Sequence, residues 1–328
     1  MIQRAVIQRA LQRLRGRNAD PDVSIAHTFR PSPYGGSNQF LVALRAELNR
    51  RGLTVGAEVI GPSTRACVLN SFAFDDEQLR RTRHPQVKII HRIDGPVDVY
   101  RGRDEGVDGY VHELNHELAD ATIFQSHYSY EANRALGFEF VDPIVIPNAV
   151  DPSIFHPPAE PLPTEGRKIR LVATSWSDNP NKGGATYKWL EENLDWDRYE
   201  FTFVGRTQYP LSRARVLPAL PSQGVASVLR EHDIYVTASR FESCSNALLE
   251  ALASGLPAAF VDSGSNAEIV GDGGLPFVAD DELPAVLDAL VSELEERRSR
   301  IAISTLSEVA DRYLAVMDLP APSTQQQR

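Results

Sequence analysis

Short apolar runs alternate with longer segments of helical periodicity along almost the whole chain. In the first half the apolar runs cover residues 23–29, 55–60, 67–72, 87–93, 121–125 and 144–146. Helical patterns lie between them, for example over residues 38–51 and 128–136. Strands that alternate with helices in this way are typical of parallel sheets with crossover helices. The first half therefore predicts an α/β domain.

The second half repeats the pattern after a proline-rich segment. Predicted strands cover residues 169–174, 200–204, 234–238 and 258–261, and predicted helices cover residues 185–193, 225–231, 245–254 and 283–300. Between the halves, over residues 151–168, there are five prolines, and proline donates a hydrogen bond to neither a helix nor a strand ladder. We therefore predict two Rossmann-like, doubly wound domains that face a cleft. The N-terminal domain would cover residues 21–155 and the C-terminal domain residues 156–328, with the last helix a candidate to return to the N-terminal domain.

Residues 1–20 form a basic extension with a helical pattern. Arginines and no acidic residues occur over residues 1–17, and the apolar positions recur at helical spacing: Ile2, Val6, Ala10 and Leu14. Such a helix can lie on an anionic membrane surface as a peripheral contact. Because its apolar face has no aromatic anchor, we favour the alternative of a solubilising or packing extension. The arginines also interrupt any continuous apolar core, so the pattern does not suit a secretory signal.

The composition of the chain argues against several classes of function. The 328 residues suit two domains, and 42% hydrophobic with 24% charged residues is an ordinary globular balance. A net charge of −10 argues against binding nucleic acid through charge. Cys67 and Cys244 are too few for a disulfide framework, which favours a reducing, cytoplasmic location. No apolar run reaches the roughly 20 residues of a membrane span, and no His/Cys spacing typical of a metal site or P-loop motif occurs.

The most informative segment is residues 239–257, which follow the predicted strand 234–238. A polar loop with Glu242 leads to a serine cap at Ser245, and the following helix ends at Gly255 before Pro257. The start of such a helix offers free backbone N–H groups and the positive end of the helix dipole, which suit a phosphate. Glu250 lies five residues beyond Ser245, about 7.5 Å along the helix axis. That separation suits a carboxylate that binds ribose while a diphosphate lies at the helix start.

The spacing from Glu242 to Glu250 resembles the E-x7-E signature of retaining glycosyltransferase family 4, an enzyme family with the GT-B architecture. The resemblance covers about residues 25 to 280. It implies that Glu242 contacts the donor sugar, that Glu250 binds ribose, and that the amides around Ser245, Asn246 and Ala247 bind phosphate. It also implies a nucleoside diphosphate sugar as co-substrate, with UDP or GDP favoured, and no other cofactor or metal.

In the N-terminal half, two segments after predicted strands are similar to the same family. Gly35 and Gly36 permit a close approach of backbone to ligand, and the resemblance implies that they close over the donor phosphate. His91 and Asp94 follow the strand 87–93, where the family commonly has a histidine or aspartate beside the reacting sugar. We therefore count His91, Asp94 and Glu242 as candidate catalytic residues.

Lys182 resembles the lysine with which the family neutralises the leaving diphosphate, a role that suits a compact ammonium group. Many members also have an arginine just after the strand 169–174, where this chain has Ser175 and Trp176. Arg206, after the strand 200–204, is our candidate to replace that charge. Glu268, in the later glycine-rich segment, would only shape the donor pocket.

The combined pattern predicts a glycosyltransferase that transfers a sugar with retained anomeric configuration to a small-molecule or glycan acceptor. Two other classes remain open. A nucleotide-sugar epimerase would release an isomerised sugar without an acceptor, and a non-catalytic sugar-nucleotide binding protein would bind without turnover. The joint presence of Glu242, Lys182 and the Gly35-Gly36 pair favours transfer over both.

Overall fold

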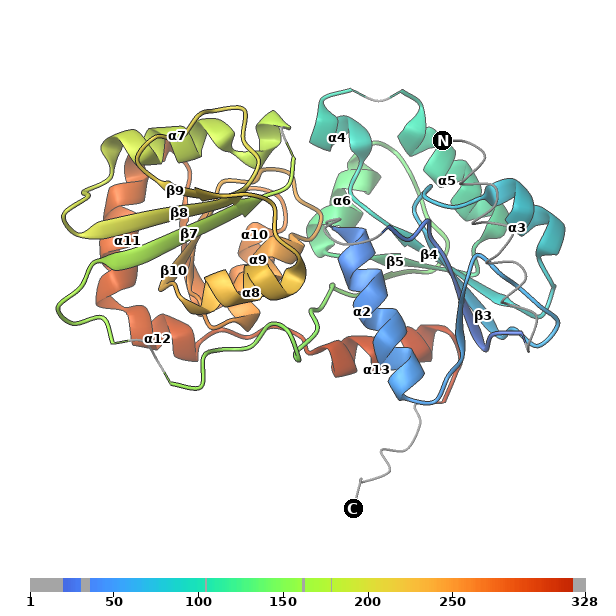
Figure 1. Ribbon diagram of the computed structural model, residues 1–328. Helices are drawn as coiled ribbons and strands as arrows, with labels where there is room; N and C mark the ends of the chain where they lie inside the picture. The colour runs from blue at the N-terminus through green and yellow to red at the C-terminus, as the bar shows by residue number, and fades with distance from the viewer. Residues whose placement is uncertain (1–19, 31–35, 104, 161–162, 178, 321–328) are drawn as a thin grey trace, which may run out of the picture.

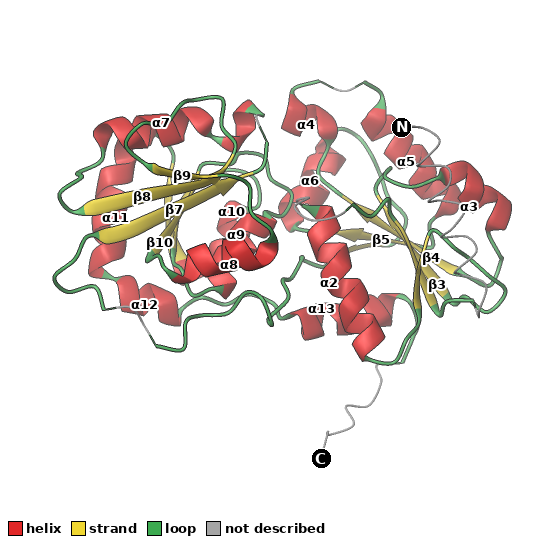
Figure 2. Cartoon of the chain, in the orientation of Figure 1, coloured by secondary structure: helices red, strands yellow, loops and turns green. Residues whose placement is uncertain are grey.

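The computed structural model describes residues 20–30, 36–103, 105–160, 163–177 and 179–320, so residues 1–19 of the basic extension and Gly35 lie outside these ranges. Two six-stranded sheets, parallel throughout, form the centres of two domains (Figures 1 and 2). The strand orders are β2-β1-β3-β4-β5-β6 and β12-β11-β10-β7-β8-β9. The prediction of two Rossmann-like domains is thereby confirmed.

The first sheet contains β1 (Val23–Ala26), β2 (Val55–Ala57), β3 (Ala66–Asn70), β4 (Lys88–Ile93), β5 (Ala121–Phe124) and β6 (Pro143–Val145). Buried side chains of α2 (Ser37–Arg50) cover one face, and those of α3 (Asp76–Thr82) and α5 (Val107–Leu118) cover the other. Two shorter helices, α4 (Val97–Arg101) and α6 (His127–Ala135), follow β4 and β5. These two lie on the side of the domain that faces its neighbour (Figure 1).

The second sheet contains β7 (Ile169–Ser175), β8 (Tyr199–Gly205), β9 (Arg215–Leu217), β10 (Ile234–Thr237), β11 (Ala258–Val261) and β12 (Gly274–Phe277). One face packs against α7 (Gly184–Asn193) and α11 (Leu283–Ser292), and the other against α8 (Ser222–Arg230) and α9 (Asn246–Ala253). The 3-10 turn η1 (Pro180–Lys182) and the short α10 (Asn266–Val270) complete the edge that faces the first domain. The single helix expected over residues 283–300 is wrong: the chain leaves helical geometry at Glu293, and α12 (Leu294–Ser299) follows separately.

The chain returns to the N-terminal domain at its end. Helix α13 (Leu306–Val316) begins with a capping box between Thr305 and Glu308 and packs against α2 (Figure 1). The rings of Phe40 on α2 and Tyr313 on α13 lie 5.8 Å apart, and Tyr313 and Leu314 are fully buried. The last helix is thus part of the core of the first domain.

Candidate functional site

Two clefts meet where the domains face each other. The C-terminal cleft, of about 920 Å³, is lined by residues that include Trp176, Lys182, Glu242, Ser245, Asn246, Ala247 and Glu250, with Gly36 and Gln39 from the opposite domain. The N-terminal cleft, of about 950 Å³, is lined by residues that include Phe72, Asp94, Tyr100, Arg101 and Phe241. Gly36, Glu242 and Cys244 line both. Ligands in the two clefts would therefore meet beside Glu242.

Helix α9 begins at the wall of the C-terminal cleft. Ser245 is its N-cap, and the Ser245 hydroxyl accepts a hydrogen bond from the N–H of Leu248 at 3.4 Å. Asn246 is held from the other domain: its Nδ2 donates to the carbonyl oxygen of Gly36 at 2.5 Å, and its Oδ1 accepts from Asn148 Nδ2 at 2.9 Å. The side chain of Asn246 therefore fixes the distance between α9 and the Gly36 loop. The positive end of α9 faces the cleft and suits an anion there.

Lys182 and Glu242 form an ion pair on the same wall. Lys182 Nζ lies 2.5 Å from Glu242 Oε1, and the two side chains are only 24% and 13% exposed. Nζ also lies 5.7 Å from the ring centroid of Tyr100, which belongs to the opposite domain. Burial opposes the charge on Lys182, but attraction to Glu242 and to Tyr100 outweighs it and raises the pKa. Lys182 is therefore a permanent positive charge in this cleft.

Glu250 lies farther along the C-terminal cleft, one helical turn beyond the start of α9. Among the residues that the structure describes, no hydrogen bond or ion pair reaches its carboxyl group. Burial raises the pKa of this group to about 8. A partly enclosed carboxyl group whose acceptor capacity is unused can bind a hydroxyl-bearing ligand.

A second loop supports the backbone that carries Glu242. The N–H of Ser265 donates to the carbonyl oxygen of Glu242 at 2.9 Å, and the N–H of Phe241 donates to Ser263 Oγ at 3.1 Å. Gly264 passes so close that a Cβ atom there would lie 2.6 Å from the nitrogen of Glu242. Its φ of +64° is also one that other residues rarely adopt. The position of Glu242 thus depends on glycine at 264.

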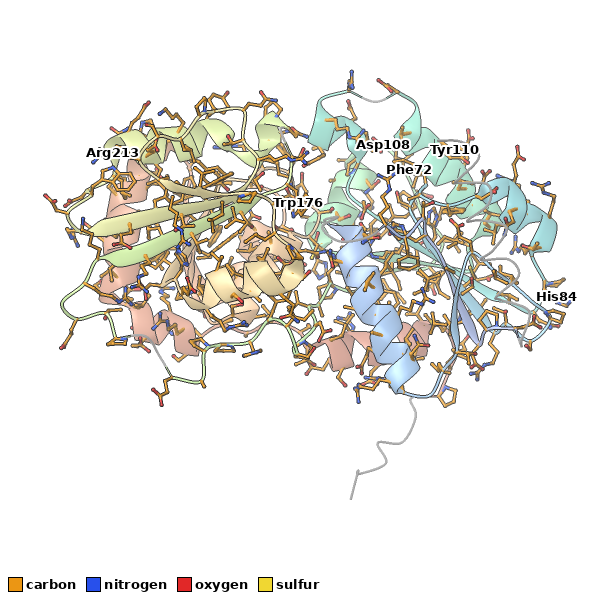
Figure 3. The ribbon with its side chains drawn as sticks, viewed as in Figure 1. Phe72, His84, Asp108, Tyr110, Trp176 and Arg213 are labelled. Atoms are coloured by element: carbon orange, nitrogen blue, oxygen red, sulfur yellow. The ribbon has the colours of Figure 1, made fainter. Side chains whose placement is uncertain are left out.

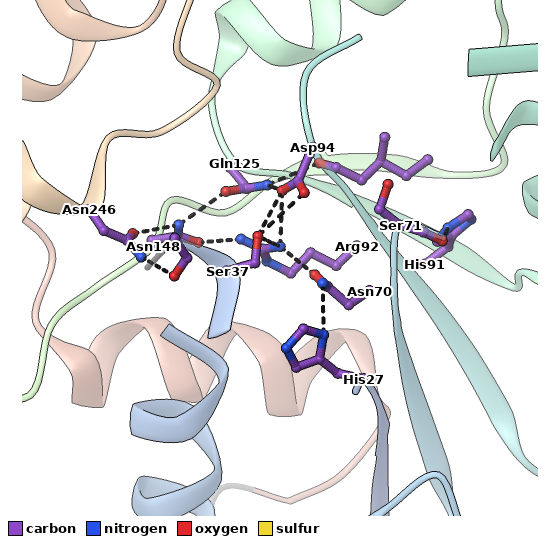
Figure 4. Close-up of polar contacts among 12 residues, drawn as sticks. His27, Ser37, Asn70, Ser71, His91, Arg92, Asp94, Gln125, Asn148 and Asn246 are labelled. Carbon is purple, nitrogen blue, oxygen red and sulfur yellow. Dashed lines mark hydrogen bonds and ion pairs between the residues drawn. The ribbon is translucent and has the colours of Figure 1, made fainter. Parts of the chain in front are cut away.

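Asp94 faces the N-terminal cleft and is the end of a buried polar network (Figure 4). It accepts hydrogen bonds from Ser37 Oγ at 3.2 Å, from Arg92 at 3.2 Å, and from Gln125. The fully buried Arg92 also donates to Asn148 Oδ1 at 2.9 Å. Because Asn148 bonds to Asn246, the network links Asp94 to the start of α9. The Asp94 side chain is still 39% exposed, so its oxygens remain open to a ligand.

Comparison with known proteins agrees with this arrangement. Residues 189–296 match the sequence profile of the family described as glycosyl transferases group 1. The match lies within the C-terminal domain, which is therefore similar to that of group 1 glycosyltransferases. No curated protein matches the sequence significantly.

Solved structures share the fold of this glycosyltransferase. Sucrose-phosphate synthase from Thermosynechococcus elongatus superposes with a TM-score of 0.72 at 15% identity, over 92% of this chain and 98% of that one. HepE from Anabaena, in complex with UDP and glucose, superposes with a TM-score of 0.66 at 11% identity, over 90% of this chain and 98% of that one. TarM from S. aureus, in complex with fondaparinux, alpha-GlcNAc-glycerol and UDP, gives 0.58 at 14% identity, over 77% of this chain and 55% of that one. All are GT-B structures, so the chain has the GT-B fold.

His91 is not where the sequence analysis expected it in this glycosyltransferase. Successive residues of a strand point to opposite faces, so Arg92 reaches the network while His91 points away from it, toward Ser71 (Figure 4). His91 is fully buried, its Nε2 donates to the carbonyl oxygen of Ser71 at 2.8 Å, and its Nδ1 accepts from Asn115 at 3.4 Å. Burial lowers its pKa to about 4. This placement contradicts a direct role in the reaction, and the expectation for His91 is corrected to a structural one.

Arg206 of the glycosyltransferase lies beside the C-terminal cleft, not along it. It is exposed and lines a smaller adjoining recess with Ser175, Lys182 and Tyr209. Its backbone N–H donates to the carbonyl oxygen of Ser175 at 2.9 Å. Whether it replaces the missing family arginine therefore stays a prediction, as does the role of Gly35, which lies outside the described residues.

Several residues at the junction escaped the sequence analysis. Tyr100, Arg92 and Asn148 carry no motif, and only the three-dimensional arrangement brings them to the site of the transferase. Within the described ranges, no group of three His, Cys, Asp or Glu residues could hold a metal ion. In the same part of the chain, no helix has the length and apolar character needed to cross a membrane.

Proposed function

We propose that this glycosyltransferase transfers a sugar from a nucleoside diphosphate sugar to an acceptor hydroxyl with retained anomeric configuration. The observation that carries the proposal is the shared cleft of Lys182, the start of α9 and Glu250. These three line one cleft and supply a positive charge, a set of backbone donors and a hydroxyl acceptor. That set of groups suits the diphosphate and the ribose of a nucleotide.

The donor would lie along the C-terminal cleft. Its ribose would contact Glu250, its diphosphate would lie between Lys182 and the N–H groups of Ser245, Asn246 and Ala247, and its sugar would lie beside Glu242. Gly36 approaches the same cleft from the other domain and would border the phosphate. HepE and TarM were both solved with UDP, which favours UDP over GDP as the nucleotide here.

In the proposed reaction, the bond between the anomeric carbon and the diphosphate oxygen breaks. The acceptor oxygen forms a bond on the same face of that carbon, and its proton passes to the departing diphosphate. The products are a glycoside and a nucleoside diphosphate, and no further reactant is consumed. Lys182 and α9 stabilise the charge that develops on the diphosphate. Glu242, paired with Lys182, orients the sugar by its hydroxyls.

Closure of the two domains around the donor would exclude water from the reacting carbon. Support comes from contacts that already join the domains at the junction. Asn181 Nδ2 donates to the carbonyl oxygen of Tyr100 at 2.6 Å, and Asn246 Nδ2 donates to that of Gly36. Exclusion of water favours transfer over hydrolysis of the donor.

The deciding experiment is a thermal-shift panel with UDP, GDP, ADP and TDP on wild type, Glu250→Ala and Glu192→Ala. Glu192 is an exposed carboxylate of α7 and serves as the control. A nucleotide at 100 times its Kd stabilises the folded state by about 2.7 kcal/mol. We expect one nucleotide to raise the Tm of wild type and Glu192→Ala but not of Glu250→Ala. If Glu250→Ala responds like wild type, or no nucleotide binds, the proposal fails.

The stereochemical part of the proposal has its own test. Proton NMR of the transferase product, made from an α-linked donor of the preferred nucleotide, should show an α-linked product. A β-linked product would disprove retention and leave the donor site intact.

A further inference from the structure

The N-terminal cleft has two exposed phenylalanines, one from each domain. Phe72 follows β3 and is 42% exposed, and Phe241 precedes Glu242 and is 39% exposed. Side chains of this size are normally buried, so two exposed rings on one cleft are informative. Figure 3 shows Phe72 on the N-terminal domain near Asp108, another residue of this cleft.

The backbone is unusual at Phe241 and at the residue directly before Phe72. Phe241 has a φ of +57°, and Ser71, directly before Phe72, has a φ of +48°. Non-glycine residues in this region cost roughly 1–3 kcal/mol each and persist where the surrounding structure fixes them. The N–H of Ser71 is fixed by the carbonyl oxygen of Arg92 at 2.7 Å, and that of Phe241 by Ser263. The surrounding structure thus fixes the backbone beside each ring, and two exposed aromatic rings on one cleft suit a ligand with an apolar face.

The charged side chains of the N-terminal cleft differ in whether they have a partner within the protein. Asp94 is paired with Arg92, and Glu242 is paired with Lys182. The carboxylate of the buried Asp108 accepts from the N–H groups of Val97 and Asp98 at 2.7 and 2.9 Å. Arg101 is different, since it is exposed and no carboxylate of the described residues lies within ion-pairing distance of it. Among the described residues of the cleft, Arg101 is therefore the charged side chain without an internal partner, and its guanidinium is available to a ligand.

We propose that the N-terminal cleft binds the acceptor, and that the acceptor is a sugar with an anionic group, either phosphate or carboxylate. The apolar C–H face of the sugar ring packs against Phe72 and Phe241. The guanidinium of Arg101 binds the anion, for which its planar donor geometry is suited. A hydroxyl of the same sugar then lies near Asp94 and Glu242, where the donor sugar ends. The inference rests on the proposed function and specifies its second substrate.

The test measures binding by saturation-transfer NMR and calorimetry with UDP present. The probes are glucose 6-phosphate, fructose 6-phosphate, mannose 6-phosphate and glucuronate, each beside its neutral sugar. The variants are Arg101→Gln and, as the matched control, Arg103→Gln, because Arg103 is an exposed arginine two residues away that pairs with Glu105. We expect at least one anionic sugar to bind wild type about tenfold more tightly than its neutral counterpart. Arg101→Gln should abolish that preference, while Arg103→Gln keeps it.

The aromatic contact is tested separately with Phe72→Ala. This exposed side chain can be removed with little effect on folding, and we expect about tenfold weaker binding of both the anionic and the neutral sugar. If neutral sugars bind as well as anionic ones, or if both arginine variants lose affinity equally, the proposal is overturned. A wild type that responds to UDP but binds no anionic sugar also overturns it and leaves the proposed function standing. Absence of any nucleotide response would instead overturn both.

Discussion

The carboxylate of Glu268 accepts two hydrogen bonds from the N–H of His127, at 2.9 and 3.0 Å, across the boundary between the domains. Glu268 belongs to α10 of the C-terminal domain, and His127 is the first residue of α6 in the N-terminal domain. The carboxylate therefore caps a helix of the opposite domain and interacts favourably with its dipole. Figure 2 shows α10 and α6 on the facing sides of the two domains. The contact therefore joins the two domains in the arrangement that the structure shows.

Glu268→Gln should accordingly weaken closure without altering the donor site. Hydrogen bonds to a charged acceptor contribute about 1.5–3 kcal/mol, and exposure of Glu268 reduces this to about 1–2 kcal/mol. We expect the transfer rate to fall about tenfold, the ratio of donor hydrolysis to transfer to rise, and the UDP thermal shift to remain. Glu131→Ala, which removes an exposed carboxylate from the same α6, should have no effect. Equal losses in the two variants would argue against a role of the Glu268–His127 contact in domain closure.

Lys182→Ala should remove the main positive charge of the C-terminal cleft. Loss of one stabilising group of this kind commonly lowers kcat 100- to 1000-fold, and we expect a loss in that range with Lys182→Arg intermediate. Arg206→Gln is the comparison, and because Arg206 lies outside the cleft we expect less than about a threefold change. A large loss in Arg206→Gln would instead support its role as the replacement for the family arginine.

The titration of Lys182 leads to a separate prediction. Its pKa is raised by Glu242 and Tyr100 despite burial, so the ammonium group stays charged across the neutral range and above it. The rate of transfer should therefore show no decline that originates from Lys182 below about pH 10, close to the usual lysine pKa. A decline near pH 8 to 9 that disappears in Lys182→Arg would contradict this.

Glu250 predicts a pH-dependent stability of the protein without ligand. Its pKa in the folded state is about 8, above the ordinary value of 4.5 because of burial. Folding therefore takes up a proton between these values, and stability is lost as the pH rises from about 4.5 to 8. Glu250→Gln lacks this loss. The free energy of unfolding of the variant should therefore equal that of wild type near pH 4.5 and exceed it by about 1–3 kcal/mol above pH 8. Urea unfolding at pH 5, 7 and 9 measures the difference, and parallel curves would refute the assignment.

The predicted pattern in the C-terminal domain reproduced the structure well because its signals are local. A serine cap, a helix of eight residues and a terminating glycine all lie within residues 245–255 and fix α9 without tertiary information. The edge strands β9 and β12 were not predicted, because three or four residues give too short an alternation to recognise. The break at Glu293 was also missed, since the apolar periodicity continues from Leu290 to Leu294 across it.

The errors in the N-terminal domain came from relationships that are not local. Whether His91 or Arg92 faces the cleft depends on which face of β4 is covered by α2, and a shift by one residue exchanges the two. Glu268 of the C-terminal domain was expected to be structural, and the structure adds its contact with His127, which no local pattern marks because the two residues are 141 apart in the chain. Arg92, Asn148 and Tyr100 join the site only through packing of the two domains, and no motif in the sequence marks them.

The position of α13 predicts that the last helix stabilises the first domain and not the second, which precedes it in the chain. Leu314 is fully buried against α2, and Leu287 of α11 is fully buried in the C-terminal core. Each leucine-to-alanine change should lower the free energy of unfolding of its own domain by about 2–5 kcal/mol. In differential scanning calorimetry we expect two unfolding transitions, and UDP should raise the transition temperature of the C-terminal domain only. Leu314→Ala should lower the transition temperature that UDP leaves unchanged. Leu287→Ala should lower the transition temperature that UDP raises. If both variants lower the same transition, α13 is energetically part of the C-terminal domain and this prediction is wrong.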